Sequence, residues 1–384
     1  MKKLIAISVM LTLIAGAAFA QTVVGGNVRM GLQLLAGDSV EGSEIGAGRI
    51  EIFDMVTNVS FGDSLNGGMM RLYAKMNQWE PALFGFLFFR PIEQIRIQIG
   101  QNPDNDFGSH QISGWGFNAE AQGGAALDQH RLLNGVNIPA RTAGWYGGFG
   151  DLGLAISIFP VPDLLTFNLG IPFVGPAQDS TFLHNRLDLN STYLRTHIQA
   201  VVDIEDIGAI RATAQLRGLA ANDDFLIPNI FASFYLTAIE GMGLDIGFAY
   251  RKPNTTGSDI VTSSAADVMV PEIGLGFRFT ADSFNIKLRA GAVIAETYTD
   301  MGIHILPSYT INNLTILLNA GFGLRIPDAD VDPTIGWFVN PYITTTFGPI
   351  RFYGGFQLFD NGAGHDNAPD GLNWAIPISF NVYF

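Results

Sequence analysis

Apolar residues occupy every second position over long stretches of this chain. Counting back from the C-terminus, the alternate positions are Phe384, Val382, Phe380, Ile378, Ile376 and Trp374. A period of two places such residues on one face of a β-strand and their neighbours on the other. Pro377 lies within this stretch and has no backbone N–H to donate, so a bulge or local break is expected there.

The same alternation recurs in segments of about 9–13 residues, which is the length that a tilted strand needs to cross a bilayer. Within these segments the alternation is clearest at 70–75, 94–99, 210–217, 284–290 and 314–325. Alternation alone fits both a soluble sandwich and a membrane barrel. Small residues within the strands favour the barrel, as do aromatic residues toward strand ends, where interfacial girdles belong. These aromatic residues are Trp79, Tyr250, Phe347, Trp374 and Phe384.

The connections between these segments are of two kinds. Short turns are expected at 62–68, 91–93, 160–163, 203–208, 240–243, 281–283, 312–313 and 348–349. Longer polar loops are expected at 101–150, 171–189, 219–227, 251–267, 326–335 and 360–372. Short periplasmic turns opposite long external loops are typical of bacterial outer-membrane barrels. The sequence therefore predicts an all-β, antiparallel, up-and-down transmembrane β-barrel of about eighteen strands, with sixteen as the second choice.

The first twenty residues have the pattern of an export signal. Lys2 and Lys3 precede an apolar run, and Ala18 and Ala20 form a small-residue cleavage site. We expect residues 1–20 to be a cleaved signal peptide and 21–384 to form a single barrel in the bacterial outer membrane. The apolar run is too short to span a membrane comfortably as a helix.

Most basic residues fall on the polar face of the predicted strands. Each would cost roughly 2–4 kcal/mol if it faced lipid at mid-bilayer, so this face is expected to line the lumen. The predicted pore-lining residues are Arg29, Arg71, Lys75, Arg96, Arg195, Arg211, Arg217, Arg278, Lys287, Arg289, Arg325 and Arg351.

Acidic residues concentrate in the predicted loops. Asp104, Asp106, Glu120 and Asp128 lie in the loop 101–150, which is a candidate constriction opposite the basic wall. Opposed charges across a constriction orient polar solutes and set ion preference. Two other interpretations stay open: the wall arginines pair structurally with loop carboxylates, or the loop plugs the lumen.

Several classes of function are disfavoured. The formal net charge of −14 argues against nucleic-acid binding, and the absence of cysteine excludes disulfides and thiol chemistry. Asp328, Asp330 and Asp332 alternate as calcium ligands do, but they do not complete an EF-hand. A Ser191–His197 pair was considered as a catalytic candidate, but no nucleophile-elbow motif accompanies it. We therefore expect no enzyme activity, no cofactor and no metal site.

The C-terminal strand resembles the assembly signal of bacterial outer-membrane barrels. The terminal Phe384 is preceded by Val382, Phe380 and Ile378 at alternate positions, with Tyr383 beside the end. The rest of the chain resembles porin-like proteins in architecture. This resemblance implies insertion into outer-membrane lipid by the barrel assembly machinery and a monomeric or trimeric diffusion pore.

Together these features predict a channel for passive diffusion of small hydrophilic solutes or ions through a basic-walled lumen. The alternative is a non-conducting barrel that acts as a structural protein, adhesin or antigen through its long loops. The position of the loop 101–150 distinguishes the two hypotheses. The basic wall favours anions within the barrel, while the acidic loops favour cations at its mouth.

Overall fold

The computed structural model describes most of the strand-forming chain. The described residues are 22–38, 46–75, 80–101, 110–111, 145–146, 152–172, 196–216, 228–251, 270–296, 298–328, 332–360 and 372–384. Among these residues, no helix has the length and apolar character needed to cross a membrane. The expected signal peptide, residues 1–20, lies outside the described residues, so its cleavage stays a prediction.

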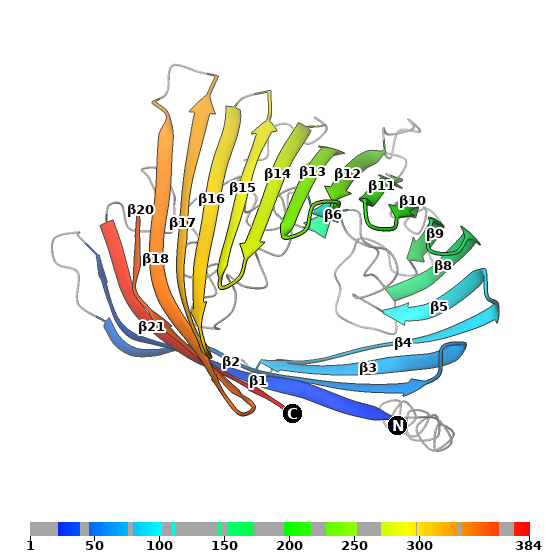
Figure 1. Cartoon of the computed structure of the whole chain (residues 1–384), viewed down its shortest axis with the longest axis horizontal. Helices are drawn as coiled ribbons and strands as arrows, with labels where there is room; N and C mark the ends of the chain where they lie inside the picture. Colours follow the sequence, from blue (N-terminus) through cyan, green and yellow to red (C-terminus); the bar gives the residue numbers. More distant parts are fainter. Residues whose placement is uncertain are drawn as a thin grey trace.

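Long β-strands make up the described chain (Figure 1). The first half contains β1 (Val23–Asp38), β2 (Gly46–Gly62), β3 (Asn66–Lys75), β4 (Glu80–Ile92), β5 (Ile95–Gln101), β6 (His110–Gln111), β7 (Trp145–Tyr146), β8 (Leu152–Val161), β9 (Leu165–Pro172) and β10 (His197–Ile204). The second half contains β11 (Gly208–Gln215), β12 (Asn229–Leu236), β13 (Met242–Arg251), β14 (Val270–Ala281), β15 (Phe284–Ile294), β16 (Tyr298–Ile311), β17 (Leu314–Pro327), β18 (Thr334–Phe347), β19 (Ile350–Gly355), β20 (Gln357–Asp360) and β21 (Leu372–Tyr383).

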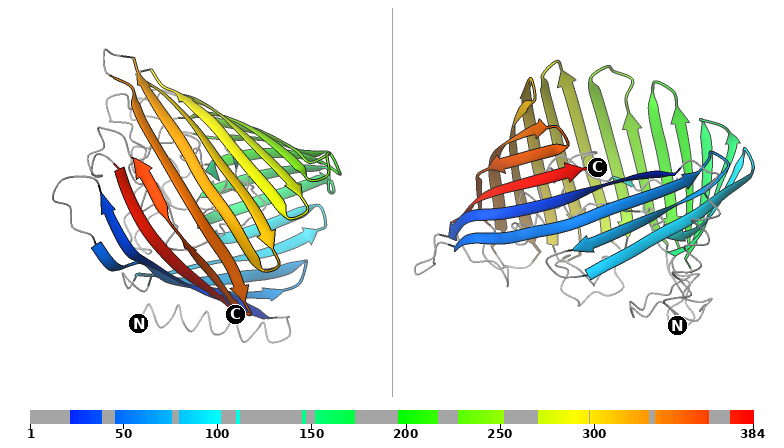
Figure 2. Two further views of the ribbon diagram at one scale, coloured as in Figure 1. Left: turned by 60° about the vertical axis from the view of Figure 1, so that its left-hand side comes forward. Right: turned by 90° about the horizontal axis from the view of Figure 1, so that it is seen from below.

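These strands form one closed antiparallel ring. Each wall strand pairs with its neighbours in the chain, and β1 pairs with β21 to close the sheet. β19 and β20 both pair with β18 and β21, so together they fill a single place in the ring. The sheet contains 19 strand segments, and counting β19 and β20 as one gives eighteen strands. The predicted barrel and its strand number are therefore confirmed, and Figure 2 shows the tilt of its strands.

All eight short turns lie where the sequence predicted them, and all at one end of the barrel, hereafter the turn end. Asp163, Asp206, Asp282 and Asn312 adopt positive φ angles at four of these turns. Short polar residues tolerate this conformation better than most others, which explains why the turns could be recognised. At the β2–β3 turn the Asp63 carboxylate accepts hydrogen bonds from the N–H groups of Leu65 and Asn66 at 2.8 Å, and these lower the pKa of that carboxyl.

The opposite end, hereafter the loop end, is less regular than predicted. Long connections follow β5, β9, β11, β13 and β20, but β15 and β16 are joined by only a few residues, 295–297. The short strands β6 and β7 pair with each other and not with the barrel wall. β6 lies beside β12 and β13, on the inner side of the ring in Figure 1. Trp145 and Tyr146 therefore belong to the long connection between β5 and β8.

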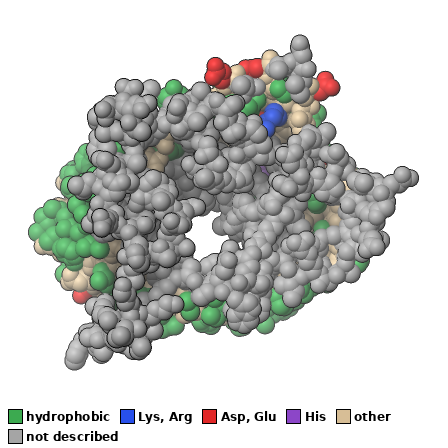
Figure 3. Space-filling model, turned by 180° about the vertical axis from the view of Figure 1, so that it is seen from behind, with side chains coloured by type: hydrophobic (Ala, Val, Ile, Leu, Met, Phe, Trp, Pro, Cys, Tyr) green, Lys and Arg blue, Asp and Glu red, His purple; other side chains and the backbone are tan. Residues whose placement is uncertain are grey.

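The two faces of the wall differ in polarity as the alternation requires. Along β14, Ile273 and Leu275 are exposed on the outside, while Glu272 and Gly274, at the alternate positions, are buried on the inside. In Figure 3 hydrophobic side chains cover the outer flanks of the described chain, and acidic side chains gather at one rim. An exposed apolar belt around a closed ring is the surface that a lipid bilayer requires.

The expected irregularity at Pro377 is found in the strands on either side of it. In β1 the register shifts between Gln33 and Leu35, opposite Pro377. On the other side the strand is interrupted between β19 and β20 at Phe356. Because proline cannot donate a ladder hydrogen bond, the regular pairing is interrupted on both sides at this point.

Candidate functional site: the charged inner wall

The inner face of β11–β15 carries a dense group of charged side chains, and some of the predicted residues belong to it. Eight of the twelve predicted pore-lining residues have described side chains: Arg71, Arg96, Arg211, Arg278, Lys287, Arg289, Arg325 and Arg351. Arg29 and Lys75 lie in β1 and β3, but only their backbone is described. Arg195 and Arg217 lie outside the described residues, as do Asp104, Asp106, Glu120 and Asp128.

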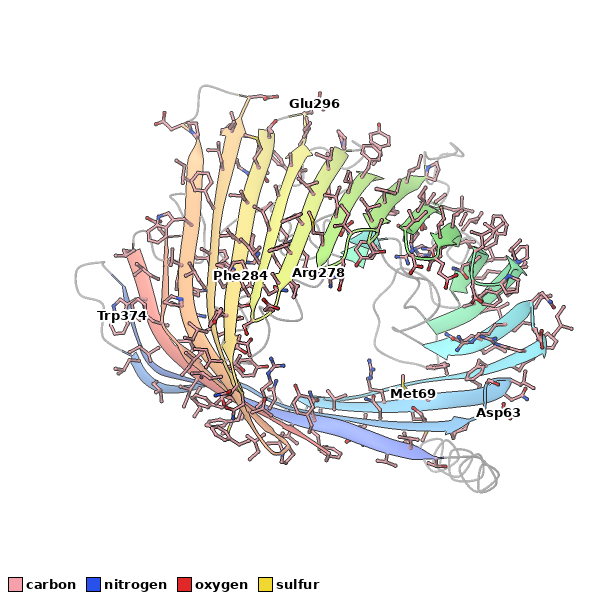
Figure 4. The ribbon with its side chains drawn as sticks, viewed as in Figure 1. Asp63, Met69, Arg278, Phe284, Glu296 and Trp374 are labelled. Atoms are coloured by element: carbon pink, nitrogen blue, oxygen red, sulfur yellow. The ribbon has the colours of Figure 1, made fainter. Side chains whose placement is uncertain are left out.

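Arg278 and Lys287 form a like-charged pair directly across β14 and β15. On the other side Arg278 faces Gly243, which leaves room for the guanidinium to reach the Tyr235 hydroxyl at 3.4 Å. Like charges placed directly opposite in a sheet destabilise it. The stability of the sheet therefore does not explain why these two basic residues face each other. Figure 4 shows Arg278 on the inner side of the ring, on the wall opposite Met69.

Arg289 extends this basic group toward β16. It lies directly across from His304 on one side and Gly276 on the other, and it is buried. On its other side His304 pairs with Gly321 of β17, which in turn pairs with Phe338 of β18. The centres of the His304 and Phe338 rings lie 5.3 Å apart, across that glycine. The absence of a side chain at Gly321 thus lets two rings of non-neighbouring strands touch.

Acidic residues also lie on the inner wall, which corrects the picture of a basic wall with acids confined to loops. Asp245, Glu272 and Asp300 are buried in β13, β14 and β16. Asp245 and Asp203 lie close enough to Arg211 for direct electrostatic attraction. The sequence carried the signal, because Asp245 alternates with the exposed residues Ile246 and Phe248 in the same strand.

A bidentate ion pair joins β16 and β17 near the loop end. Arg325 donates from Nε and Nη2 to the two carboxylate oxygens of Asp300 at 2.7 and 2.6 Å. The guanidinium also lies 4.5 Å from the centre of the Tyr298 ring. Such fork-shaped pairing fixes geometry as well as charge, so this arginine is held against the wall.

Two arginines on β4 and β5 rest on aromatic rings. The Arg96 guanidinium lies 4.4 Å from the centre of the Phe88 ring, and that of Arg90 lies 5.5 Å from the centre of the Phe159 ring. Arg90 was not among the predicted residues. Its strand is almost wholly apolar on both faces, so alternation gave little sign of its direction. This wall therefore combines positive charge with aromatic surface.

A neutral hydrogen-bonded group lines β9–β11. The Asn168 amide donates to the Gln199 carbonyl oxygen at 3.0 Å, and the Gln199 amide donates to the Thr213 hydroxyl at 2.9 Å. All three side chains are buried. Each of the two amides therefore has a partner in the neighbouring strand.

The described residues offer little for metal or covalent chemistry. No group of three or more histidine, aspartate or glutamate side chains within the described ranges is placed to hold a metal ion. His197 is buried on β10, whereas Ser191 lies outside the described residues. The proposed serine–histidine pair is thus left untested.

Known proteins resemble this chain in structure and not in sequence. No protein-family model and no curated protein sequence matches it. Among solved structures, the outer-membrane protein OpdK of Pseudomonas aeruginosa matches with a TM-score of 0.57 at 10% identity, over 95% of this chain and 99% of that chain. A BenF-like porin of Pseudomonas fluorescens Pf-5 gives 0.58 at 10% identity, over 95% and 98%.

A third match is Pseudomonas aeruginosa OccK2 (OpdF), solved in complex with glucuronate. It gives a TM-score of 0.56 at 10% identity, over 95% of this chain and 98% of that chain. At such low identity these matches establish a shared fold. The chain has the closed β-barrel fold of bacterial outer-membrane porins.

Proposed function

We propose that this protein is a bacterial outer-membrane channel through which small hydrophilic solutes or ions diffuse passively. The observation that carries the proposal is the polarity of the closed ring. Its outside is exposed and apolar, while buried charged and amide side chains line its inside. A polar interior is the arrangement found in water-filled barrels.

The charge of the wall supports a preference for anions within the barrel. Arg278, Lys287 and Arg289 are neighbours on the inner face, and Arg90 and Arg96 lie on another part of the wall. Rings of basic side chains favour anions in membrane pores. Asp245, Glu272 and Asp300, which are also buried, reduce this preference. The glucuronate complex of OccK2 is consistent with a carboxylate as one such anion.

The remaining parts of the proposal come from the sequence. Residues 1–20 are proposed to direct export, and Ile378, Phe380, Val382 and Phe384 to be read by the barrel assembly machinery. The barrel then resides in outer-membrane lipid, as a monomer or an oligomer, with no role in nucleic-acid binding or catalysis. A non-conducting display protein is the alternative.

Single-channel recording tests the proposal directly. The mature chain, refolded and inserted into a planar bilayer, should give stable conductance steps in a salt gradient. The sign of the reversal potential should show that anions permeate more readily than cations. Folded, inserted barrels that pass no current would refute the channel and favour the display protein. A cation preference would refute the role assigned to the basic wall.

A further inference from the structure

A row of amide side chains with a histidine at one end crosses the inner wall from β16 to β20. It consists of His304, Asn319, Asn340 and Gln357, which lie on adjacent strands. The Asn319 carbonyl oxygen accepts a hydrogen bond from His304 Nε2, and Asn319 pairs directly with Asn340 in the register. Asn340 also lies beside Gln357. On one side of them Val339 pairs with Leu358, and on the other the Phe356 N–H donates to the Pro341 oxygen at 3.0 Å.

Asn340 and Gln357 differ from the buried amides Asn168 and Gln199, which hydrogen-bond to each other. Within the described part of the chain, Asn340 and Gln357 are 0% exposed and neither the nitrogen nor the oxygen of either amide is hydrogen-bonded. The Asn319 amide nitrogen and the Ser379 hydroxyl are in the same condition. A buried polar group without a partner is destabilising, and native proteins keep few of them. Asn319, Asn340 and Gln357 therefore present several unpartnered donors and acceptors side by side on three adjacent strands.

The chemistry of the row indicates which solute would fit it. Each amide presents both a donor and an acceptor. A carboxylate would engage only the amide N–H groups and a cation only the amide oxygens, so either would leave half of the row unpaired. Arg289 lies across from His304 at one end of the row, whereas Arg325 and Arg351, the basic residues of β17 and β19, lie toward opposite ends of their strands, away from the amides. Hydroxyl groups can both donate to the amide oxygens and accept from the amide N–H groups.

An apolar surface adjoins the row. Phe338 and Tyr342 flank Asn340 on the inner face of β18, and Tyr342 packs with Leu306, Leu317 and Tyr353 in a buried cluster. Neighbouring strands place their side chains about 5 Å apart, which is comparable with the distance across a sugar ring. Aromatic surface beside a set of amides suits a molecule with hydroxyl groups at its edge and C–H groups on its face.

We propose that this amide row is a subsite for an uncharged polyhydroxylated solute of the carbohydrate class. The subsite rests on the proposed channel, in which it would bind a passing solute that the basic wall does not attract. The amides are buried by their surroundings, so neighbouring side chains must move before a solute enters. Binding should therefore produce resolved interruptions of the current and not a fast flicker.

Sucrose is the probe, and polyethylene glycol of similar mass is the comparison, because its chain offers ether acceptors and almost no donors. In bilayers containing the full mature chain, sucrose should interrupt the ion current and the glycol should not. Asn340→Leu and Gln357→Met remove the amides with little change in volume, and each should reduce sucrose affinity about tenfold, the effect of losing one or two hydrogen bonds. Gln199→Met is the matched control, because that amide is already satisfied by Asn168 and Thr213.

Calorimetric titration of the detergent-solubilised barrel with sucrose separates the subsite from the channel. Binding that depends on Gln357 in a barrel that passes no current would support the subsite and refute the channel. A barrel that conducts ions but does not bind sucrose would overturn the subsite and leave the proposed channel standing. Sucrose binding that is unchanged in both Asn340→Leu and Gln357→Met would also overturn the subsite. If neither variant folds, the titration of the wild-type barrel decides, and a wild-type barrel that does not bind sucrose overturns the subsite.

Discussion

The ion pair between Arg325 and Asp300 shows how single residues hold the inner wall together. Both oxygens of the carboxylate are engaged at 2.6–2.7 Å, and Asp300 is buried. A charge left without its partner in such a place is costly, because burial has removed the water that would otherwise solvate it.

Asp300→Asn should therefore destabilise the barrel by on the order of 3 kcal/mol, since it leaves the Arg325 charge without its counter-ion. Denaturant unfolding of the refolded barrel in lipid vesicles measures this change. Asp328→Asn is the control, because Asp328 lies exposed just beyond the same strand as Arg325. Equal stability of the two variants would show that the pair contributes nothing.

The direction of a residue could be predicted from the sequence far better than its partners could. Alternation placed Arg278, Lys287 and Arg325 on the polar face of their strands. It could not show that Arg278 faces Lys287 or that Arg325 meets Asp300, because such pairs depend on the register between strands. Asp300 was missed because Thr299 and Asp300 precede the clear apolar alternation of β16.

At the scale of the element, the turns set the register of the hairpins, and two glycines serve this role differently. Gly208 at the start of β11 has a φ of +144°, and a Cβ there would lie 1.9 Å from the Tyr235 carbonyl oxygen of β12. Gly348 between β18 and β19 has a φ of +57°, and a Cβ there would meet nothing within 4 Å.

Gly348→Ala should consequently cost about 1–2 kcal/mol, the price of the left-handed backbone alone. Gly208→Ala should cost clearly more and lower the yield of refolded barrel, because it also forces β12 away from β11. Heat-modified electrophoretic mobility and denaturant unfolding of both variants provide the comparison. Similar losses at the two positions would contradict the clash at Gly208.

Turn position was the most predictable property of the elements, because it depends on local chemistry. Asp163, Asp206, Asp282 and Asn312 occupy turn positions with positive φ, where few residue types are tolerated. The loop end has no such local rule. The brief connection at 295–297 was missed because the apolar run of β15 continues almost to its edge.

At the scale of the whole molecule, the balance of charge on the inner wall should determine ion preference. Replacing both members of the like-charged pair, Arg278→Gln with Lys287→Gln, should shift the permeability ratio toward cations by roughly twofold. The reversal potential in a salt gradient measures this shift. Asp282→Asn changes a charge in the turn between the same two strands and should leave the ratio unchanged. An unaltered ratio in the double variant would remove this pair from the permeation path.

The contact between β1 and β21 has a consequence for the order of events in time. Gly26 and Phe384 exchange backbone hydrogen bonds at 2.9 and 3.1 Å, so the first strand to be synthesised completes its pairing only with the last. Joining these distant segments in an unfolded chain would cost about 5 kcal/mol of loop-closure entropy. Growth of the sheet from neighbouring hairpins removes most of that cost, because its curvature carries the two edges toward each other. The pairing of β1 with β21 then forms last. Until it forms, β1 and β21 are unpaired edge strands to which a folding catalyst, or a strand of another protein, can bind.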